Sequence, residues 1–268
     1  MNKKFSEIAS NYDAFIVDLW GVIHDGQNLY PGVMQTLQAL KSMNKKVLFL
    51  SNAPRRAEKV KEVLGNFGIT PDLYIDAVSS GEVTYQILKI NYASAKYIYI
   101  GPDKDRCLLG GLNFEEVSDA SKADFAITTG FDKDDSTLAE KLPQIESCLK
   151  AGLKLYCANP DLIVVRQDGT KMLCAGVIGE YYQQEGGKVE FIGKPHKEVY
   201  EYALKALGTN KILAVGDSPE TDIKGANNMN IDSVLLLGGI LKAESRPLAE
   251  VLIEKQAEPT YIIENFSW

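Results

Sequence analysis

The sequence has few cysteines, no excess of positive charge and no long apolar segment, and each absence excludes a class of protein. Its four cysteines form no C-x-x-C pair, so we expect neither a zinc site nor a disulfide framework and place the chain in the cytoplasm. The formal net charge is −7, so we expect no nucleic acid and no anionic membrane as a partner. No uninterrupted apolar segment is long enough to cross a bilayer, and polar residues follow Met1 where a signal peptide would be apolar.

The length and composition of the chain are ordinary for a globular enzyme. The chain has 268 residues, 45% of them hydrophobic and 24% charged, and this length allows one large domain or two modest ones. An acidic protein that binds phosphate must gather positive charge locally or use a metal cation. The sequence leaves open whether the chain forms a homo-oligomer.

Apolar segments of strand length alternate with segments of helical periodicity. Strands are predicted at 15–17, 47–50, 97–101, 125–130, 153–159, 191–193, 212–216, 233–239 and 261–263. Helices are predicted at 33–40, 60–67, 138–149, 198–207 and 223–228. This alternation is typical of an α/β fold with a parallel sheet.

Four of these predicted strands are followed at once by a polar side chain suited to binding phosphate, namely Asp18, Ser51, Lys194 and Asp217. If the strands lie side by side, their carboxyl ends share one edge, which is where ligands bind in α/β sheets. Asp18 and Asp217 could then hold a hard cation such as magnesium. Ser51 could bind phosphoryl oxygens, and Lys194 would supply positive charge. Asp222 could act through water or orient Lys194.

Each of these residues alone has a simpler explanation. Ser51 and Asn52 could form a turn, Asp222 could cap a helix, and Lys194 could lie in a surface turn. Their common placement after apolar segments is harder to explain by turns, and it favours a site for phosphoryl transfer.

Four segments, in this order, resemble the motifs of the haloacid dehalogenase (HAD) superfamily. They are Asp18-Leu19-Trp20-Gly21-Val22-Ile23, Phe49-Leu50-Ser51-Asn52, Gly193-Lys194-Pro195 and Gly216-Asp217-Ser218-Pro219-Glu220-Thr221-Asp222-Ile223. The last is similar to the Gly-Asp-x-x-x-Thr-Asp-Ile motif of subclass IIA, the NagD-like sugar and nucleotide phosphatases. Asn159-Pro160-Asp161 resembles the cap motif of that subclass. The resemblance implies a Rossmann-like core of residues 1–77 and 191–268, with an α/β cap domain inserted at 78–190.

The resemblance also implies a role for each matching residue. Asp18 would be the nucleophile, forming an aspartyl-phosphate, with Ser51 and Lys194 as the other catalytic residues. The implied ligands of Mg²⁺ are Asp18, the backbone carbonyl of Trp20, Asp217 and Asp222. The implied binding set for a small phosphorylated metabolite is Gly21, Ser51, Asn52, Ala53, Asn159, Asp161 and Lys194.

One position departs from the family's pattern. Phosphatases of this family carry a second aspartate two residues after the nucleophile, which protonates the leaving alcohol, whereas this chain has Trp20. An indole N–H donates a hydrogen bond but is no useful acid near neutral pH, and acid–base help is typically worth ~100- to 10,000-fold. His24 and Asp25 are the nearest substitutes, although a solvated loop also explains both.

The sequence therefore supports three hypotheses. The leading one is a magnesium-dependent phosphatase of a small phosphorylated metabolite. The second is a catalytically weak or inactive relative that binds a phosphorylated ligand. The third, a dehalogenase-like hydrolase, is disfavoured by Asp217 and Asp222, because the superfamily's dehalogenases work without the metal cluster.

Overall fold

The computed structural model describes residues 4–268, and its largest sheet has six parallel strands. In order across the sheet they are β13 (Tyr261–Ile263), β12 (Asp232–Leu236), β11 (Ile212–Gly216), β1 (Ala14–Val17), β2 (Lys46–Ser51) and β3 (Asp76–Ser79). The central strand β1 places Ala14 opposite Ile212 of β11 and Lys46 of β2. All four residues of β1 are buried, as expected for a parallel strand covered on both faces.

Helices cover both faces of this six-stranded sheet, because successive side chains of a strand point to opposite faces. Phe15 and Val17 of β1 pack with the helices of one face, α1 (Phe5–Ala9), α2 (Val33–Ser42) and α3 (Ala57–Asn66). Ala14 and Ile16 belong to the apolar cluster of the other face, which includes α7 (Lys197–Leu207). A π-helical turn (Pro219–Ile223), α8 (Lys224–Asn228) and α9 (Leu248–Lys255) complete this part of the chain.

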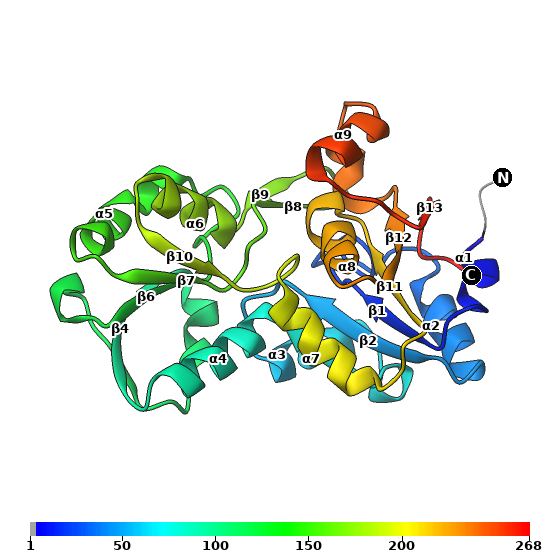
Figure 1. The fold of residues 1–268 in the computed structure, drawn as a ribbon, viewed down its shortest axis with the longest axis horizontal. Helices are drawn as coiled ribbons and strands as arrows, with labels where there is room; N and C mark the ends of the chain where they lie inside the picture. The colour runs from blue at the N-terminus through cyan, green and yellow to red at the C-terminus, as the bar shows by residue number, and fades with distance from the viewer. Residues whose placement is uncertain (1–3) are drawn as a thin grey trace.

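A second parallel sheet lies beside the first and forms a separate lobe in Figure 1. Its strand order is β10 (Lys188–Phe191), β7 (Lys154–Cys157), β6 (Phe125–Thr128), β4 (Ala95–Ile100) and β5 (Phe114–Glu116). One face packs against α5 (Leu142–Lys150) and α6 (Ala175–Gln184), and the other shares an apolar cluster with α4 (Ser80–Asn91). Short 3-10 helices lie at Pro71–Leu73, Asp103–Leu109, Ala120–Lys122, Leu138–Glu140 and Gly239–Ala243.

An antiparallel hairpin, β8 (Ile163–Val165) and β9 (Lys171–Leu173), belongs to neither large sheet. It lies between the two lobes in Figure 1. The loop at its tip closes with a hydrogen bond from the Arg166 N–H to the Thr170 carbonyl. The strand β8 contacts the 3-10 helix Gly239–Ala243, which follows β12 of the first sheet.

The predicted α/β class with a Rossmann-like parallel sheet is confirmed, but one predicted strand is wrong. The segment 191–193 was expected to end beside Asp18 in the core sheet, whereas the strand is β10, which ends at Phe191 and pairs with β7 in the second sheet. Lys194 therefore reaches the first sheet from the connection between β10 and α7. The sequence patterns also missed β3, β5, the hairpin, α1, α4, α6 and α9.

We propose that the second sheet and its helices form the inserted cap domain. The strands of that sheet begin at Ala95 and end at Phe191, while β3 continues the first sheet as far as Ser79. On this basis the expected boundaries at 77 and 191 would each move by one or two residues. No helix among residues 4–268 has both the length and the apolar character that a bilayer span requires.

Candidate active site

Asp18 and Asp217 meet because each directly follows one of two neighbouring strands. The N–H of Asp18 donates to the Val215 carbonyl across from it at 2.9 Å, so the ladder of β1 and β11 continues up to Asp18. Asp217 is the first residue after β11. Oxygen atoms of Asp18, Asp217 and Asp222 all lie within 4.8 Å of one another, and all three residues are buried. The carboxyl edge of the sheet thus carries a cluster of three carboxylates.

Two glycines allow the loops around this cluster to approach Asp217 closely. Gly21 has a φ of +87°, and a Cβ atom there would lie 2.0 Å from Oδ2 of Asp217. Gly239 has a φ of +60°, and its Cβ atom would lie 1.9 Å from the same oxygen. The adjacent N–H of Ile240 donates to this oxygen at 2.6 Å. Gly21, expected to bind substrate, is thus placed against Asp217, where only glycine fits.

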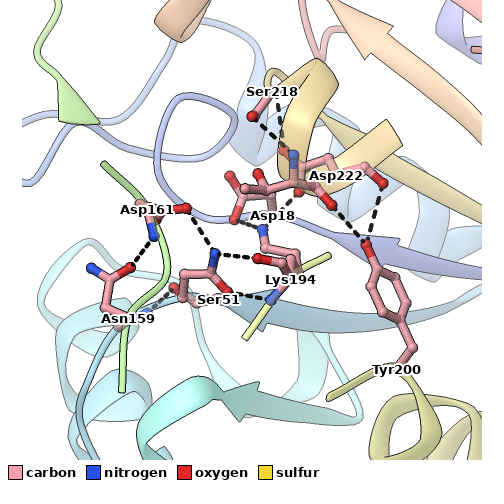
Figure 2. A network of polar contacts seen from close by, with 11 residues as sticks. Asp18, Ser51, Asn159, Asp161, Lys194, Tyr200, Ser218 and Asp222 are labelled. Carbon is pink, nitrogen blue, oxygen red and sulfur yellow. Dashed lines mark hydrogen bonds and ion pairs between the residues drawn. The ribbon is translucent and has the colours of Figure 1, made fainter. Parts of the chain in front are cut away.

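Lys194 points its ammonium group at Asp18 and Asp222, as Figure 2 shows. Its buried Nζ donates to Oδ1 of Asp18 at 2.5 Å and to Oδ1 of Asp222 at 2.7 Å. Asn52 holds the backbone of Lys194, since its Oδ1 accepts from the Lys194 N–H at 2.7 Å and its Nδ2 donates to the Lys194 carbonyl at 3.1 Å. The side chain of Asn52 thus positions the lysine, and its expected place beside the phosphoryl group stays a prediction.

Both carboxylate oxygens of Asp222 already have partners. Oδ1 accepts from Lys194, and Oδ2 accepts from the Ser218 N–H at 3.1 Å. The hydroxyl of Tyr200 donates to the Asp222 carbonyl at 3.2 Å. This arrangement fits Asp222 as the residue that orients Lys194 better than as a direct ligand of a metal.

Sequence reasoning missed three groups that hold this cluster, namely Tyr200, the Ser218 N–H and the Ile240 N–H. Tyr200 lies on helix α7, and Ile240 lies 23 residues beyond Asp217, so no local pattern links them to the site. Ser218 could have been predicted as a helix N-cap, since serine is common there. In the structure its Oγ accepts from the Thr221 N–H at 3.3 Å.

Ser51 and Ala53 lie at the end of β2, the neighbour of β1. The Ser51 Oγ accepts a hydrogen bond from the Ala53 N–H at 3.2 Å, which leaves its hydroxyl proton free to be donated elsewhere. Ser51 also lines the same cavity as Asp18 and Lys194. It is therefore placed to donate to an oxygen of a ligand.

Asn159 and Asp161 approach the cluster from the other lobe, after β7 (Figure 2). The Asn159 Oδ1 accepts from the Asp161 N–H at 2.9 Å, and the Asp161 Oδ1 accepts from Nδ2 of Asn52 at 2.7 Å. Burial raises the pKa of Asp161 to about 6, against the opposing effects of Lys194 and Asn52. The Asn52–Asp161 bond joins the two lobes beside the nucleophile expected at Asp18.

The cluster holds more negative than positive charge. Burial raises the pKa of Asp18 to about 7 even though the Lys194 ammonium opposes it. Burial, with Asp18 and Asp222, raises the pKa of Asp217 well above its usual value. Burial alone would lower the pKa of Lys194, but Asp18 and Asp222 outweigh it and raise that pKa. One ammonium thus faces three carboxylates.

A divalent cation fits this donor set, because it would balance the excess charge with the oxygen ligands that hard cations prefer. Asp18 and Asp217 supply carboxylate oxygens within reach of one ion. The backbone carbonyl of Trp20 accepts no hydrogen bond from any other residue in the range 4–268, so it is also open to a metal.

The cluster opens into a cavity of about 400 Å³ that both lobes line. The hairpin contributes Ile163, Val165 and Met172, and the second sheet contributes the segment after β6 with Thr129 and Phe131. A volume at the lower end of the usual range for ligand pockets suits a small molecule.

The interpretation of His24 and Asp25 as part of a solvated loop is wrong, since both residues are buried, and neither carries a proton suited to replace the missing acid. Burial lowers the pKa of His24 to about 4, so its imidazole is neutral at pH 7, and its Nδ1 accepts from the Gly26 N–H at 3.0 Å. Burial alone would raise the pKa of Asp25, but hydrogen bonds from the Asn28, Gln27 and Gln167 N–H groups lower it. Asp25 is therefore ionised at neutral pH.

Comparisons with known proteins agree with this geometry. A model of haloacid dehalogenase-like hydrolases matches residues 15–115, and a HAD-hydrolase-like model matches residues 191–268. The sugar-phosphatase AraL of Bacillus subtilis is 30% identical over 85% of this chain and 84% of its own length. The D-glycerol 3-phosphate phosphatase of Mycobacterium tuberculosis is 28% identical over 95% of this chain and 70% of its own length.

Solved structures show the same architecture. A haloacid dehalogenase-like hydrolase from Brucella suis superposes with a TM-score of 0.87 at 26% identity, covering 98% of each chain. A 4-nitrophenylphosphatase from Thermotoga maritima has a TM-score of 0.75 at 25% identity, covering 97% of this chain and 96% of its own. The chain belongs to the haloacid dehalogenase-like hydrolases, within the NagD-like subclass IIA.

Proposed function

We propose that this protein is a magnesium-dependent phosphatase that hydrolyses a small phosphorylated metabolite through an aspartyl-phosphate on Asp18. The observation that carries the proposal is the buried contact of Lys194 with both Asp18 and Asp222, inside a cavity that both lobes line. The names of the relatives, which include sugar and glycerol phosphate phosphatases, support the reaction class.

Asp18, Lys194 and Ser51 would each have a different role in phosphoryl transfer. The hydrogen bond from Lys194 engages Oδ1 of Asp18 and leaves Oδ2 to attack phosphorus. The Lys194 ammonium and the Ser51 hydroxyl stabilise negative charge on the phosphoryl oxygens, which is the main requirement of this reaction. A divalent cation held by Asp18, Asp217 and the Trp20 carbonyl would neutralise further charge at these oxygens.

The leaving group sets the expected substrate preference. Trp20, His24 and Asp25 offer no acidic proton at neutral pH, so a departing alkoxide would leave without a proton from any of them. A phosphate ester with a stable leaving anion needs little protonation. The enzyme should therefore act faster on aryl or acyl phosphates than on alkyl phosphates.

Phosphate release by the purified protein tests the proposal. The substrates are 4-nitrophenyl phosphate, acetyl phosphate, glycerol 3-phosphate and a sugar phosphate, each with Mg²⁺ and with a chelator. We expect release that requires Mg²⁺ and is abolished by Asp18→Asn. Asp13→Asn is the matched control, because Asp13 precedes the same strand, its side chain is 58% exposed, and it should leave turnover intact.

Other outcomes would point to the alternative functions. Binding of phosphate esters by calorimetry without any turnover would indicate a relative that only binds its ligand. Release of halide from a haloacid without Mg²⁺ would indicate a dehalogenase-like enzyme. Turnover that survives Asp18→Asn would contradict the proposed nucleophile.

A further inference from the structure

The indole ring of Trp20 connects the loop after the nucleophile to the cap hairpin. Its Nε1–H donates to the backbone carbonyl of Val165, the last residue of β8, at 2.9 Å. The ring lies against Gly26 of the same loop, where a Cβ atom would come within 2.7 Å of a ring carbon. The position that carries an acid in related phosphatases thus carries a contact between the two lobes.

A second hydrogen bond joins the same two segments. The Gln167 N–H, two residues beyond Val165, donates to Oδ2 of Asp25 at 3.3 Å. Oδ1 of Asp25 accepts from the N–H groups of Gln27 and Asn28 at 2.9 and 2.6 Å, so the core loop is itself held in one conformation. We call these two bonds, Trp20–Val165 and Gln167–Asp25, the loop–hairpin contact.

The loop–hairpin contact closes one side of the cavity above Asp18. Trp20, Ile163, Val165 and Met172 all line that cavity. The Asn52–Asp161 bond joins the lobes at another point of its wall. The hairpin packs in neither large sheet. Besides the loop–hairpin contact, it lies next to the 3-10 helix Gly239–Ala243 and is joined by an ion pair from Arg166 to Asp134, so the loop–hairpin contact is one of the few that fix its position over the cavity.

We propose that Trp20 is a positioning residue that holds the hairpin of residues 163–173 over the nucleophile and thereby limits the size of the substrate. The proposal rests on the proposed phosphatase function for its substrate, but the contact itself can be tested without turnover. Trp20 acts here through its indole N–H and its bulk, and not as an acid.

Trp20→Phe tests the contact, because phenylalanine keeps an aromatic ring but removes the N–H donor. Trp268→Phe is the matched control, since it removes the other tryptophan, which is 41% exposed near the C-terminus. Hydrogen exchange measured by mass spectrometry should show faster exchange in residues 163–173 of Trp20→Phe. The increase should be about 3- to 10-fold, the effect of losing one typical hydrogen bond, and Trp268→Phe should not show it.

Kinetics test the consequence for substrate size. The probes are glycerol 3-phosphate and a 5′-nucleotide, both alkyl phosphates, so leaving-group chemistry is matched. In Trp20→Phe the ratio of kcat/KM for the nucleotide to that for glycerol phosphate should rise, mainly through KM, while Trp268→Phe should keep the wild-type ratio.

Two results would overturn the proposal: unchanged exchange of residues 163–173, or faster exchange with no change in the substrate ratio. If the wild type releases no phosphate from any ester, the proposed function fails while the exchange result still stands. In that case the size limit is measured as the ratio of binding affinities for the same two esters by calorimetry.

Discussion

We expect the side chain at position 20 to decide which leaving groups the enzyme can expel. Trp20→Asp would place a carboxylic acid two residues after Asp18, and Trp20→Phe would remove the indole without adding an acid. Both variants lose the bond to Val165. The difference between their rates therefore reports the effect of the acidic proton at position 20, separate from the loss of that bond. We expect Trp20→Asp to exceed Trp20→Phe on alkyl phosphates by up to ~100- to 10,000-fold, and by much less on 4-nitrophenyl phosphate.

Steady-state rates on glycerol 3-phosphate and 4-nitrophenyl phosphate measure this difference. An equal gain on both substrates would show that the carboxylate helps in some way other than protonation of the leaving group. Brisk turnover of glycerol 3-phosphate by the wild type would show that another group already serves as the acid.

The carboxylate of Asp217 has no ammonium partner at hydrogen-bonding distance among residues 4–268, although it lies next to two other carboxylates. Asp217→Asn keeps an oxygen ligand but removes one negative charge, so binding of Mg²⁺ should fall below detection by calorimetry. Asp161→Asn is the control, since Asp161 bonds to Asn52 in the same cavity and should change Mg²⁺ affinity far less. Unchanged affinity in Asp217→Asn would contradict the assignment of this residue as a ligand.

Site residues that follow strands could be predicted from the sequence, and residues that act through long-range contacts could not. Asp18 and Asp217 each follow an apolar strand of the first sheet, and Ser51 is the last residue of another, so the strand pattern alone brings the three to one edge. Lys194 reaches that edge from a connection whose strand belongs to the second sheet. The strand pattern does select Lys194, as the residue after 191–193, but it puts that strand beside Asp18 in the wrong sheet, and the family resemblance supports the lysine independently.

Among the elements, those with clean periodicity were predictable and those shaped by packing were not. The helix α7 carries Val199, Ala203 and Leu207 on its buried face, which the sequence shows plainly. The helix α6 contains Gly176 and Gly179, which weaken any helical prediction. Both are needed for packing, since a Cβ on Gly176 would lie 2.3 Å from the Pro160 carbonyl and one on Gly179 would lie 2.5 Å from the ring of Phe191.

The loop that follows β1 should lose stability in acid because of His24. Its ring stacks on Phe67 with centroids 4.9 Å apart, and its Nδ1 must be unprotonated to accept from the Gly26 N–H. Burial lowers its folded-state pKa to about 4, so on acidification the unfolded chain binds a proton first. This contribution to stability is therefore present above pH 6.5 and is lost as the pH falls towards 4.

Urea denaturation at pH 8 and pH 5 measures this effect. The His24 contribution to the free energy of unfolding should fall by about 2 kcal/mol between these two values. His24→Asn should remove that part of the pH dependence, and His196→Asn, at the only other histidine, should keep it. A pH dependence that is identical in wild type and His24→Asn would contradict a neutral buried imidazole.

On the scale of the whole molecule, the two lobes share one apolar cluster, and the shared cluster should make them unfold together. Ile16 and Leu48 of the first sheet, Leu88 of α4, and Phe125 and Tyr156 of the second sheet all belong to it. The helix α4 contacts β3 and α7 and also the 3-10 helix Asp103–Leu109. We expect one cooperative transition, although the sheets are separate.

Leu88→Ala tests this coupling, because Leu88 is fully buried while Ile90 of the same helix is 79% exposed. Leu88→Ala should lower the free energy of unfolding by about 2–5 kcal/mol, and Ile90→Ala, the control, should change it little. Trp20 contacts the hairpin, so the measurement uses a Trp20→Phe background, in which the remaining tryptophan, Trp268, lies outside the second sheet and its helices. Its fluorescence follows the first lobe, whereas far-ultraviolet circular dichroism follows both. The two signals should coincide in that background and shift together when Leu88→Ala is added. Separate transitions, or a shift of circular dichroism alone, would show that the cap unfolds on its own and that the cluster does not couple the lobes.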